Sequence, residues 1–134
     1  MSLVYPKTIH LSDTDAAGVV YFAKLLDIFH EAYEESLAHF GINLQELVQK
    51  FTVALPIVHA EADFFRPIFW RDRVIIKLNP ILLSETEFEV SYSLHKEDSD
   101  KALATGMTRH VCIDSQTRKR VALPTTIKDW LKTP

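Results

Sequence analysis

The chain has 134 residues, the length of one ordinary domain. Its formal charge of −3 offers no attraction for phosphate polyanions, so we expect no nucleic-acid partner. A single cysteine excludes an internal disulfide. No apolar run reaches the roughly 18 residues of a membrane span, and the N-terminus lacks the apolar core of a signal peptide. These features predict a cytoplasmic protein without membrane contact.

The first half of the chain predicts a strand followed by two helices. Residues 3–11 are rich in β-forming side chains and predict the strand. From Phe22, apolar side chains recur every three or four residues for about 18 residues, which is the period of one helical face. Gly41 follows as a suitable C-terminal cap. Further apolar residues widen this face, so we expect the helix to be deeply covered. A weaker helical pattern follows at 43–50.

The second half predicts an antiparallel sheet, because apolar and polar side chains alternate there. The strands are expected at 57–66, 73–78, 86–94 and 102–114. Small side chains at Ala60 and Ala62 would let the long helix approach this sheet closely. A helix covering an antiparallel sheet is an α+β fold, and residues 1–134 are expected to form a single domain.

Polar segments at 95–102 and 114–120 predict turns between these strands. The second turn is expected to lead to a short last strand. A brief terminal helix is then predicted at 124–132, with Thr125 or Thr126 as its cap.

Two common kinds of catalytic site find no support. No GxSxG elbow occurs, which disfavours a Ser-His-Asp hydrolase. Cys112 lies in a predicted strand between two apolar residues, as a buried structural thiol does. His30 and Glu34 share a helical face, but the second histidine of a zincin is missing, so we expect no metal.

Asp13 and Asp15 precede the long helix and allow two interpretations. Acidic residues are common in turns near a helix start, so both aspartates could be turn residues only. However, the helical face begins at Phe22, seven residues after Asp15, and the intervening AAGVVY segment is small and apolar. At least one carboxylate is then expected beside a covered helix end, where desolvation and the helix dipole have opposite effects on its ionisation.

Residues 13–37, DTDAAGVVYFAKLLDIFHEAYEESL, resemble the signature of the 4-hydroxybenzoyl-CoA thioesterase family in the hotdog-fold superfamily. The segments ALPIVHAEADFFRPIFWRDRV (54–74) and TRHVCIDSQTRKRVALP (108–124) are similar to the same family, so the resemblance covers almost the whole chain. Within the family, the combination is most similar to the cyanobacterial 1,4-dihydroxy-2-naphthoyl-CoA thioesterases of phylloquinone biosynthesis.

The resemblance implies a hotdog fold, in which a curved antiparallel sheet wraps a long helix. It also implies homodimers or homotetramers with active sites at the subunit interface. Asp15 would be catalytic, either as nucleophile or as general base for water, and Asp13 would be a structural turn residue. The amide of Phe22, with Tyr21 beside it, would stabilise the oxyanion, and Gly18 would let the loop fold back towards the helix.

His59 is a further candidate, because its segment lies near the acyl pocket in the family; a partly exposed strand histidine is the alternative. Some 4-hydroxybenzoyl-CoA enzymes carry basic residues in the hairpin that corresponds to 82–88, where this chain has Glu85 and Glu87. The phosphates of CoA must then bind other cations. The candidates are Arg71, Arg73, Arg118, Lys119 and Arg120. CoA belongs to the substrate, so no cofactor is expected.

The expected function is therefore hydrolysis of an aromatic acyl-CoA, above all 1,4-dihydroxy-2-naphthoyl-CoA. A broader acyl-CoA or acyl-carrier-protein thioesterase is one alternative. A non-catalytic hotdog module that binds acyl-CoA is another, and the retained Asp15 argues against it. A hotdog dehydratase is disfavoured, because the residues match the thioesterase motif.

Overall fold

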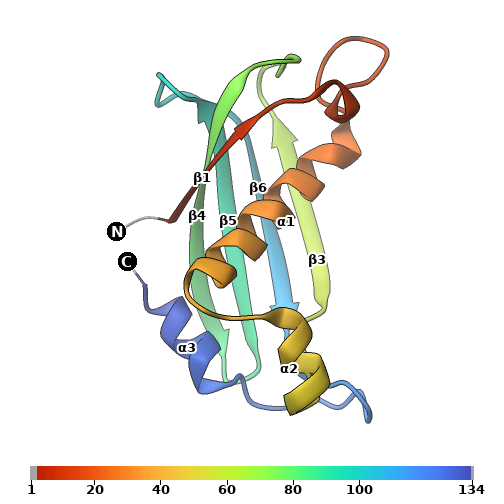
Figure 1. Ribbon diagram of the computed structural model, residues 1–134, viewed down its shortest axis with the longest axis vertical. Helices are drawn as coiled ribbons and strands as arrows, with labels where there is room; N and C mark the ends of the chain where they lie inside the picture. Colours follow the sequence, from red (N-terminus) through yellow and green to blue (C-terminus); the bar gives the residue numbers. More distant parts are fainter. Residues whose placement is uncertain (1–2, 134) are drawn as a thin grey trace.

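The computed structural model describes residues 3–133, and its centre is a five-stranded antiparallel sheet with the strand order β1-β4-β5-β6-β3 (Figure 1). The strands are β1 (Leu3–Thr8), β3 (Ile57–Phe64), β4 (Arg73–Ser84), β5 (Glu87–Lys96) and β6 (Ala102–Val111). A small separate ladder joins β2 (Val53–Ala54) to β7 (Ile113–Asp114). The helices are α1 (Phe22–His39), α2 (Leu44–Phe51) and α3 (Thr125–Leu131), and Leu11–Asp13 form a 3₁₀ turn, η1. The expected α+β fold is confirmed.

Helix α1 lies across one face of the sheet (Figure 1). It begins and ends where the apolar period predicts, and Gly41 follows it with a φ of 89°. The face towards the sheet buries Leu25, Ile28, Phe29, Ala32, Tyr33 and Leu37. The opposite face carries exposed residues such as Asp27 and Glu34, so the expectation of a deeply covered helix is wrong for the single chain. No helix within residues 3–133 is long and apolar enough to cross a bilayer.

The sheet meets α1 most closely at Gly106. A Cβ atom at this position would lie 2.5 Å from the ring of Phe29 and 2.9 Å from the carbonyl oxygen of Glu61. The Phe29 ring stacks on Tyr92 of β5, with 4.8 Å between the ring centres. The predicted small residues of β3 are present, but the glycine on β6 is what permits the close contact.

A buried row of polar side chains lies under the middle of α1, and we call it the buried polar row. A hydrogen bond of 2.8 Å joins the Tyr92 hydroxyl to Thr108 Oγ1, and another of 2.8 Å joins Thr108 Oγ1 to His110 Nε2. The His110 ring stacks on Phe88 at 4.7 Å and lies 4.6 Å from the ring of Tyr33. Burial lowers the pKa of His110 to about 4, because a charged imidazolium would lose its hydration there.

Several element boundaries differ from the predicted ones. β1 ends at Thr8 and not at residue 11, β3 ends at Phe64 and not at residue 66, and β6 ends at Val111 and not at residue 114. β4 continues to Ser84 through Pro80. Among residues 3–133, β1 pairs with β4 only as far as Leu78, so one edge of β4 has no described neighbour beyond that point. An open edge accepts a residue that has no N–H group. The predicted last strand is absent from the described residues, where Arg120 forms only an isolated bridge. Helix α3 begins after Pro124, and no side chain caps it.

Candidate active site

The segment between β1 and α1, residues 10–21, forms a loop at one end of the sheet, at the upper right in Figure 1. We call it the site loop. Backbone hydrogen bonds attach its two ends to the segment that follows β3. The amide of Ile9 donates to the carbonyl oxygen of Asp72 (2.9 Å), and the amide of Val20 donates to that of Ile68 (2.8 Å). The site loop is therefore held by main-chain contacts as well as by the packing of α1.

Asp15 occupies a tight turn in this loop, and its side chain is exposed. Its amide donates to the carbonyl oxygen of Val19 (2.9 Å), and the amide of Gly18 donates back to the carbonyl oxygen of Asp15 (3.0 Å). Gly18 has a φ of 83°, which glycine adopts without the steric cost of a side chain. Asp15 Oδ1 accepts a hydrogen bond from the amide of Ala17 (2.8 Å), and no partner is recorded for Oδ2 within residues 3–133. The turn thus orients the carboxylate and leaves one oxygen free.

Asp13 has the opposite surroundings, because its side chain is buried. Its Oδ2 accepts from the amide of His10 (2.9 Å) and lies 3.7 Å from Lys7 Nζ. Lys7 Nζ also lies 3.3 Å from Glu31 Oε2 on α1. The carbonyl oxygen of Asp13 accepts from the amide of Tyr21 (2.9 Å). These contacts match the structural role expected of Asp13.

The first turn of α1 presents unbonded amides. Tyr21 is the N-cap residue, and its side chain makes no capping hydrogen bond. Within the described part of the chain, no acceptor is recorded for the amides of Phe22 and Ala23, whereas the Tyr21 amide is used by Asp13. Free amides at a helix start, with the helix dipole behind them, stabilise a negative charge. The predicted Phe22 donor is thus available in the structure, and the Tyr21 amide is already occupied.

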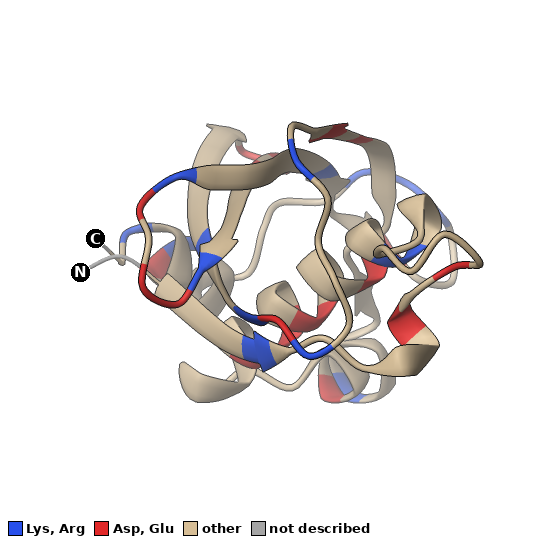
Figure 2. Ribbon diagram, turned by 90° about the horizontal axis from the view of Figure 1, so that it is seen from above, with Lys and Arg blue, Asp and Glu red and all other residues tan. Residues whose placement is uncertain are grey.

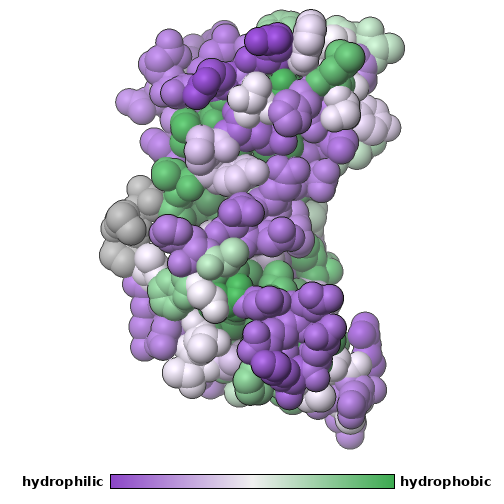
Figure 3. Space-filling view, viewed as in Figure 1, coloured by the Kyte–Doolittle hydropathy of each residue, from purple (hydrophilic) through white to green (hydrophobic). Residues whose placement is uncertain are grey.

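Exposed aromatic side chains surround the site loop, and we call them the aromatic rim. They are Tyr21, Phe22, Phe64, Phe65, Phe69 and Trp70. A hollow of about 310 Å³ opens between Val19–Val20 and residues 64–68. Figure 3 shows apolar residues interspersed with polar ones at the end of the molecule that carries the site loop. The sequence analysis missed the rim, although FFRPIFW (64–70) contains four aromatic residues in seven.

His59 does not lie beside Asp15 within one chain. It pairs with Arg109 of β6, which pairs in turn with Glu89 of β5, on the sheet face opposite α1. His59 Nε2 lies 3.1 Å from Glu61 Oε1, and both side chains are about half exposed. The acyl-pocket role predicted for His59 therefore finds no support in the single chain.

The five candidate cations for CoA phosphate do not converge. Arg71 belongs to the segment attached to the site loop, and its guanidinium lies 5.8 Å from the ring centre of Trp70. Arg73 is paired, with 2.7 Å between its Nε and Glu97 Oε2. Figure 2, which views the molecule from above, shows basic and acidic residues interspersed, without one basic patch.

The other three cations, Arg118, Lys119 and Arg120, lie in the turn after β7. The site loop is near the start of β6, whereas this turn follows the end of β6. Because β6 has 10 residues at about 3.3 Å each, the two regions are roughly 30 Å apart. Arg120 Nη1 also lies 3.3 Å from Glu87 Oε1. Within one chain this turn cannot contribute to the surroundings of Asp15.

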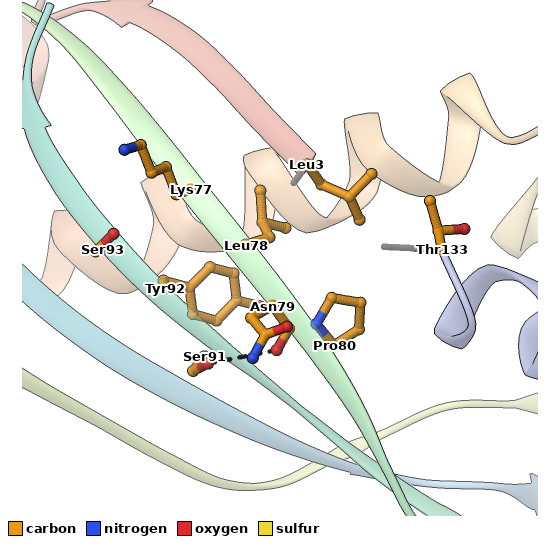
Figure 4. A pocket seen from close by; sticks show the side chains of 9 residues that line it. All are labelled: Leu3, Lys77, Leu78, Asn79, Pro80, Ser91, Tyr92, Ser93 and Thr133. Atoms are coloured by element: carbon orange, nitrogen blue, oxygen red, sulfur yellow. Dashed lines mark hydrogen bonds between the residues drawn. The ribbon is translucent and has the colours of Figure 1, made fainter. Parts of the chain in front are cut away.

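A separate cavity of about 310 Å³ lies at the opposite edge of the sheet, among β1, β4 and β5 (Figure 4). Among the described residues that line it, Lys77 alone is charged, and Ser91 Oγ donates to the carbonyl oxygen of Asn79 at 3.3 Å beside it. Within residues 3–133, neither a carboxylate nor a free helix end faces this cavity. No three metal-binding side chains cluster within residues 3–133. The site loop is therefore the place where the described residues support chemistry.

Known proteins resemble this chain over almost its full length. The sequence model of the thioesterase-like superfamily matches residues 9–131. The 1,4-dihydroxy-2-naphthoyl-CoA hydrolase of Picosynechococcus sp. is 51% identical over 98% of this chain and 93% of its own length. The enzyme of the same name from Rippkaea orientalis is 52% identical over 96% and 94%.

A solved structure agrees with these relatives. The 1,4-dihydroxy-2-naphthoyl-CoA thioesterase from Synechocystis is 37% identical and superimposes with a TM-score of 0.93, covering 98% of this chain and 96% of its own. The α+β architecture described above is accordingly the hotdog fold that the motifs predicted. The chain belongs to the thioesterase-like superfamily.

Proposed function

We propose that the protein is a cytoplasmic thioesterase that hydrolyses 1,4-dihydroxy-2-naphthoyl-CoA to 1,4-dihydroxy-2-naphthoate and CoA, a step of phylloquinone biosynthesis. One observation carries the proposal: an oriented carboxylate with a free oxygen, Asp15, belongs to a loop that ends at the unbonded amides of α1. The names of the relatives at 51% and 52% identity support the choice of acyl group.

In this proposal the free amide of Phe22 stabilises the thioester oxygen as negative charge develops on it. Asp15 acts in one of two ways. As a general base it removes a proton from water, whose oxygen attacks the acyl carbon while the C–S bond breaks and CoA leaves as its thiol. As a nucleophile it attacks the acyl carbon itself, the C–S bond breaks and CoA leaves as its thiolate. Water then cleaves the mixed anhydride, which releases the acid, restores the Asp15 carboxylate and supplies the proton that the thiolate takes up. In both routes one water is consumed for each thioester cleaved.

We further propose that a second copy of the chain completes the site, in a homodimer or a homotetramer. The aromatic rim supports this step, since Phe22, Phe65 and Trp70 are exposed by 65%, 59% and 52%. Several large apolar side chains exposed near one site favour an interaction surface there. Covering it would also exclude water from Asp15 and strengthen the electrostatic contacts made there.

Release of free thiol from a panel of aryl-CoA and alkyl-CoA substrates tests the proposal. The naphthoyl substrate is expected to have the highest kcat/KM. Hydrolysis of long-chain alkyl-CoA without hydrolysis of the naphthoyl substrate would contradict the assigned acyl group and favour a broad acyl-CoA thioesterase. Binding of aryl-CoA without any thiol release would instead indicate a non-catalytic module.

The role of Asp15 is tested by Asp15→Asn, which keeps the shape of the side chain but removes its charge. We expect kcat to fall by at least about a hundredfold with a modest change in substrate affinity, because a transition-state role is lost. The exposed Asp27→Asn is a matched control on α1 and should keep wild-type rates. A wild-type rate for Asp15→Asn would leave Asp15 with a structural role only.

A further inference from the structure

The turn at residues 69–72 lies beside the site loop, and we call it the Arg71 turn. The amide of Asp72 donates to the carbonyl oxygen of Phe69 (3.1 Å), and the amide of Phe69 donates to Asp72 Oδ2 (2.9 Å). The amide of Arg71 donates to the carbonyl oxygen of Ile9 (2.9 Å), one residue before the site loop. The main chain of the turn is therefore fixed against the end of the site loop.

Arg71 has a backbone conformation that arginine seldom adopts. Its φ is 73°, and it is the third residue of the turn, where type II turns have a positive φ and usually a glycine. A side chain at positive φ has a steric cost, and such residues cluster at ligand-binding positions. Among the described residues, Thr52 and Arg118 share this conformation, but they flank the β2–β7 ladder at the other end of the sheet. Of the three, Arg71 is the one that adjoins the site loop.

The side chain of Arg71 is exposed. No ion pair of Arg71 is recorded within residues 3–133, whereas Arg73, two residues later, lies 2.7 Å from Glu97. The guanidinium carbon of Arg71 lies 5.8 Å from the ring centre of Trp70, whose side chain is 52% exposed. A contact of this kind at an exposed site contributes little to the stability of a fold. A ligand therefore explains the pair better than the fold does.

The two side chains match the chemistry of a nucleotide. A guanidinium binds phosphate through parallel N–H groups, and an exposed indole stacks on the face of a base. CoA joins an adenine ring to several phosphate groups. A neighbouring indole and guanidinium can therefore bind both parts of this end of CoA at once.

The distance from the site loop suits such a contact. The amide of Asp15 bonds to Val19, and Val19 pairs with Phe69, the first residue of the Arg71 turn. With about 5 Å for each pair and two further residues to Arg71, the Cα atoms of Asp15 and Arg71 lie within about 18 Å of each other. The pantetheine arm of CoA has about as many bonds as four residues of extended chain, so it reaches about 15 Å. The two side chains can cover the remainder.

We propose that the Arg71 turn binds the nucleotide end of the CoA substrate, with the adenine stacked on Trp70 and a phosphate bound by Arg71. The inference rests on the proposed function and specifies where the leaving CoA is held. Of the five cations considered above, it assigns the phosphate to the one that adjoins the site loop and has no recorded ion pair within residues 3–133. It requires that the second copy leaves one face of the Trp70 ring open.

The kinetics of Arg71→Gly test the assignment. KM for 1,4-dihydroxy-2-naphthoyl-CoA should rise at least about tenfold with kcat nearly unchanged, because a contact made equally before and during the reaction is lost. The variant should melt at or above the wild-type temperature, since glycine adopts a positive φ without the steric cost. Lys101→Gln removes an exposed charge at the same end of the sheet and should keep the wild-type KM. A wild-type KM for Arg71→Gly, or a joint loss of melting temperature and kcat, would overturn the assignment.

A truncated substrate shows which part of CoA makes the contact. The pantetheine thioester of 1,4-dihydroxy-2-naphthoate has the same acyl group and reacting bond but lacks the nucleotide. The wild type and Arg71→Gly should hydrolyse it with the same kcat/KM. An equal loss with the truncated and the complete substrate would place Arg71 at the acyl group or the pantetheine arm, and the nucleotide site would be wrong.

Binding of free CoA gives a test that needs no turnover. Calorimetric titration should show that Trp70→Ala binds CoA about tenfold more weakly, because the stacking contact with adenine is lost. Arg71→Lys should bind CoA more tightly than Arg71→Gly but less tightly than the wild type, since lysine keeps the charge without the paired N–H groups. Phe40→Ala, at an exposed aromatic residue after α1, is the matched control and should bind as the wild type does. Equal CoA affinity in Trp70→Ala and the wild type would contradict the stacking.

The outcomes separate the two proposals. A wild type that hydrolyses the naphthoyl substrate while Arg71→Gly keeps its KM overturns the nucleotide site and leaves the proposed function standing. A wild type that binds CoA through Trp70 and Arg71 but hydrolyses no acyl-CoA overturns the proposed function and leaves the nucleotide site standing.

Discussion

Helix α1 has polar groups beside it in two regions, the site loop at its start and the buried polar row under its middle. In the buried polar row, Tyr92, Thr108 and His110 bond to one another and are covered on all sides. In the site loop, Asp15 and the amide of Phe22 are exposed and keep unused hydrogen-bonding capacity. The hydrogen bonds among Tyr92, Thr108 and His110 stabilise the fold in the buried polar row. The unused hydrogen-bonding groups of the site loop remain available to bind a substrate and react with it. The predictions below separate the two regions by measuring stability and turnover independently.

The largest effect is expected from protonation of His110. Its folded-state pKa of about 4 lies below the value near 6.5 of an unfolded chain. Above pH 6.5 both states are neutral; as pH falls from 6.5 to 4, only the unfolded state takes up the proton. The free energy of unfolding should therefore fall by about 3 kcal/mol over this range. Urea titrations at several pH values measure this loss.

His110→Phe keeps the stacked ring and removes the titration, so its difference from the wild type isolates the contribution of His110. Turnover by the folded protein should stay near that of the wild type. His59→Gln, at an exposed histidine, is the control. If His110→Phe lost stability with acid as steeply as the wild type, the low pKa would not be the cause.

The next effect is expected at the close contact between the sheet and α1. Gly106→Ala would place a Cβ 2.5 Å from the ring of Phe29 and 2.9 Å from the carbonyl oxygen of Glu61, so one of these neighbours must shift. Overpacking of this kind should lower the free energy of unfolding by about 2 kcal/mol. Thr105→Ala, next to it on β6 but on the other face of the sheet, should cost far less. Equal urea midpoints for the two variants would mean that the contact is loose.

Asp13→Asn is expected to act on stability, in contrast to Asp15→Asn. It removes the charge that pairs with Lys7 in a buried position and weakens the hydrogen bond from the amide of His10. A loss of about 1.5 kcal/mol is expected, with turnover by the folded protein changed only a few-fold. The melting temperature and kcat, measured on the same variant, distinguish a loss of stability from a loss of turnover. A pure loss of turnover at unchanged melting temperature would exchange the roles of the two aspartates.

The smallest effect is expected from Glu31→Gln. This carboxylate lies 3.3 Å from Lys7 Nζ, but its side chain is 39% exposed. Solvent screens such a pair, so the variant should lose only about 0.5 kcal/mol in urea unfolding. A loss larger than that of Asp13→Asn would show that Lys7 depends more on α1 than on the site loop.

The sequence predicted what depends on local periodicity. The apolar period from Phe22 and the glycine at position 41 placed α1, and alternation placed β5 within two residues at each end. Motif resemblance predicted the fold family and drew attention to Asp15. The turn at Gly18 also has the positive φ that its role requires.

Features that depend on distant contacts could not be predicted in this way. The amide of Tyr21 is occupied because the chain folds back onto the carbonyl oxygen of Asp13, eight residues earlier. His59 faces away from α1 because of its pairing with Arg109 on β6. Among residues 3–133, nothing covers the side chain of Asp15. For Tyr21 and His59, the partner that decides the contact is remote in sequence.

The site loop has a consequence for how activity should vary with dilution. Its carboxylate and helix amides are assembled within one chain, whereas in the homodimer or homotetramer that we propose the aromatic rim is covered by a second copy. Mass action then links catalysis to association. Above the dimer dissociation constant the rate per chain should be constant, and below it the rate should fall in proportion to the fraction of chains paired. A progress curve recorded after rapid dilution would show this decay as the dimers separate.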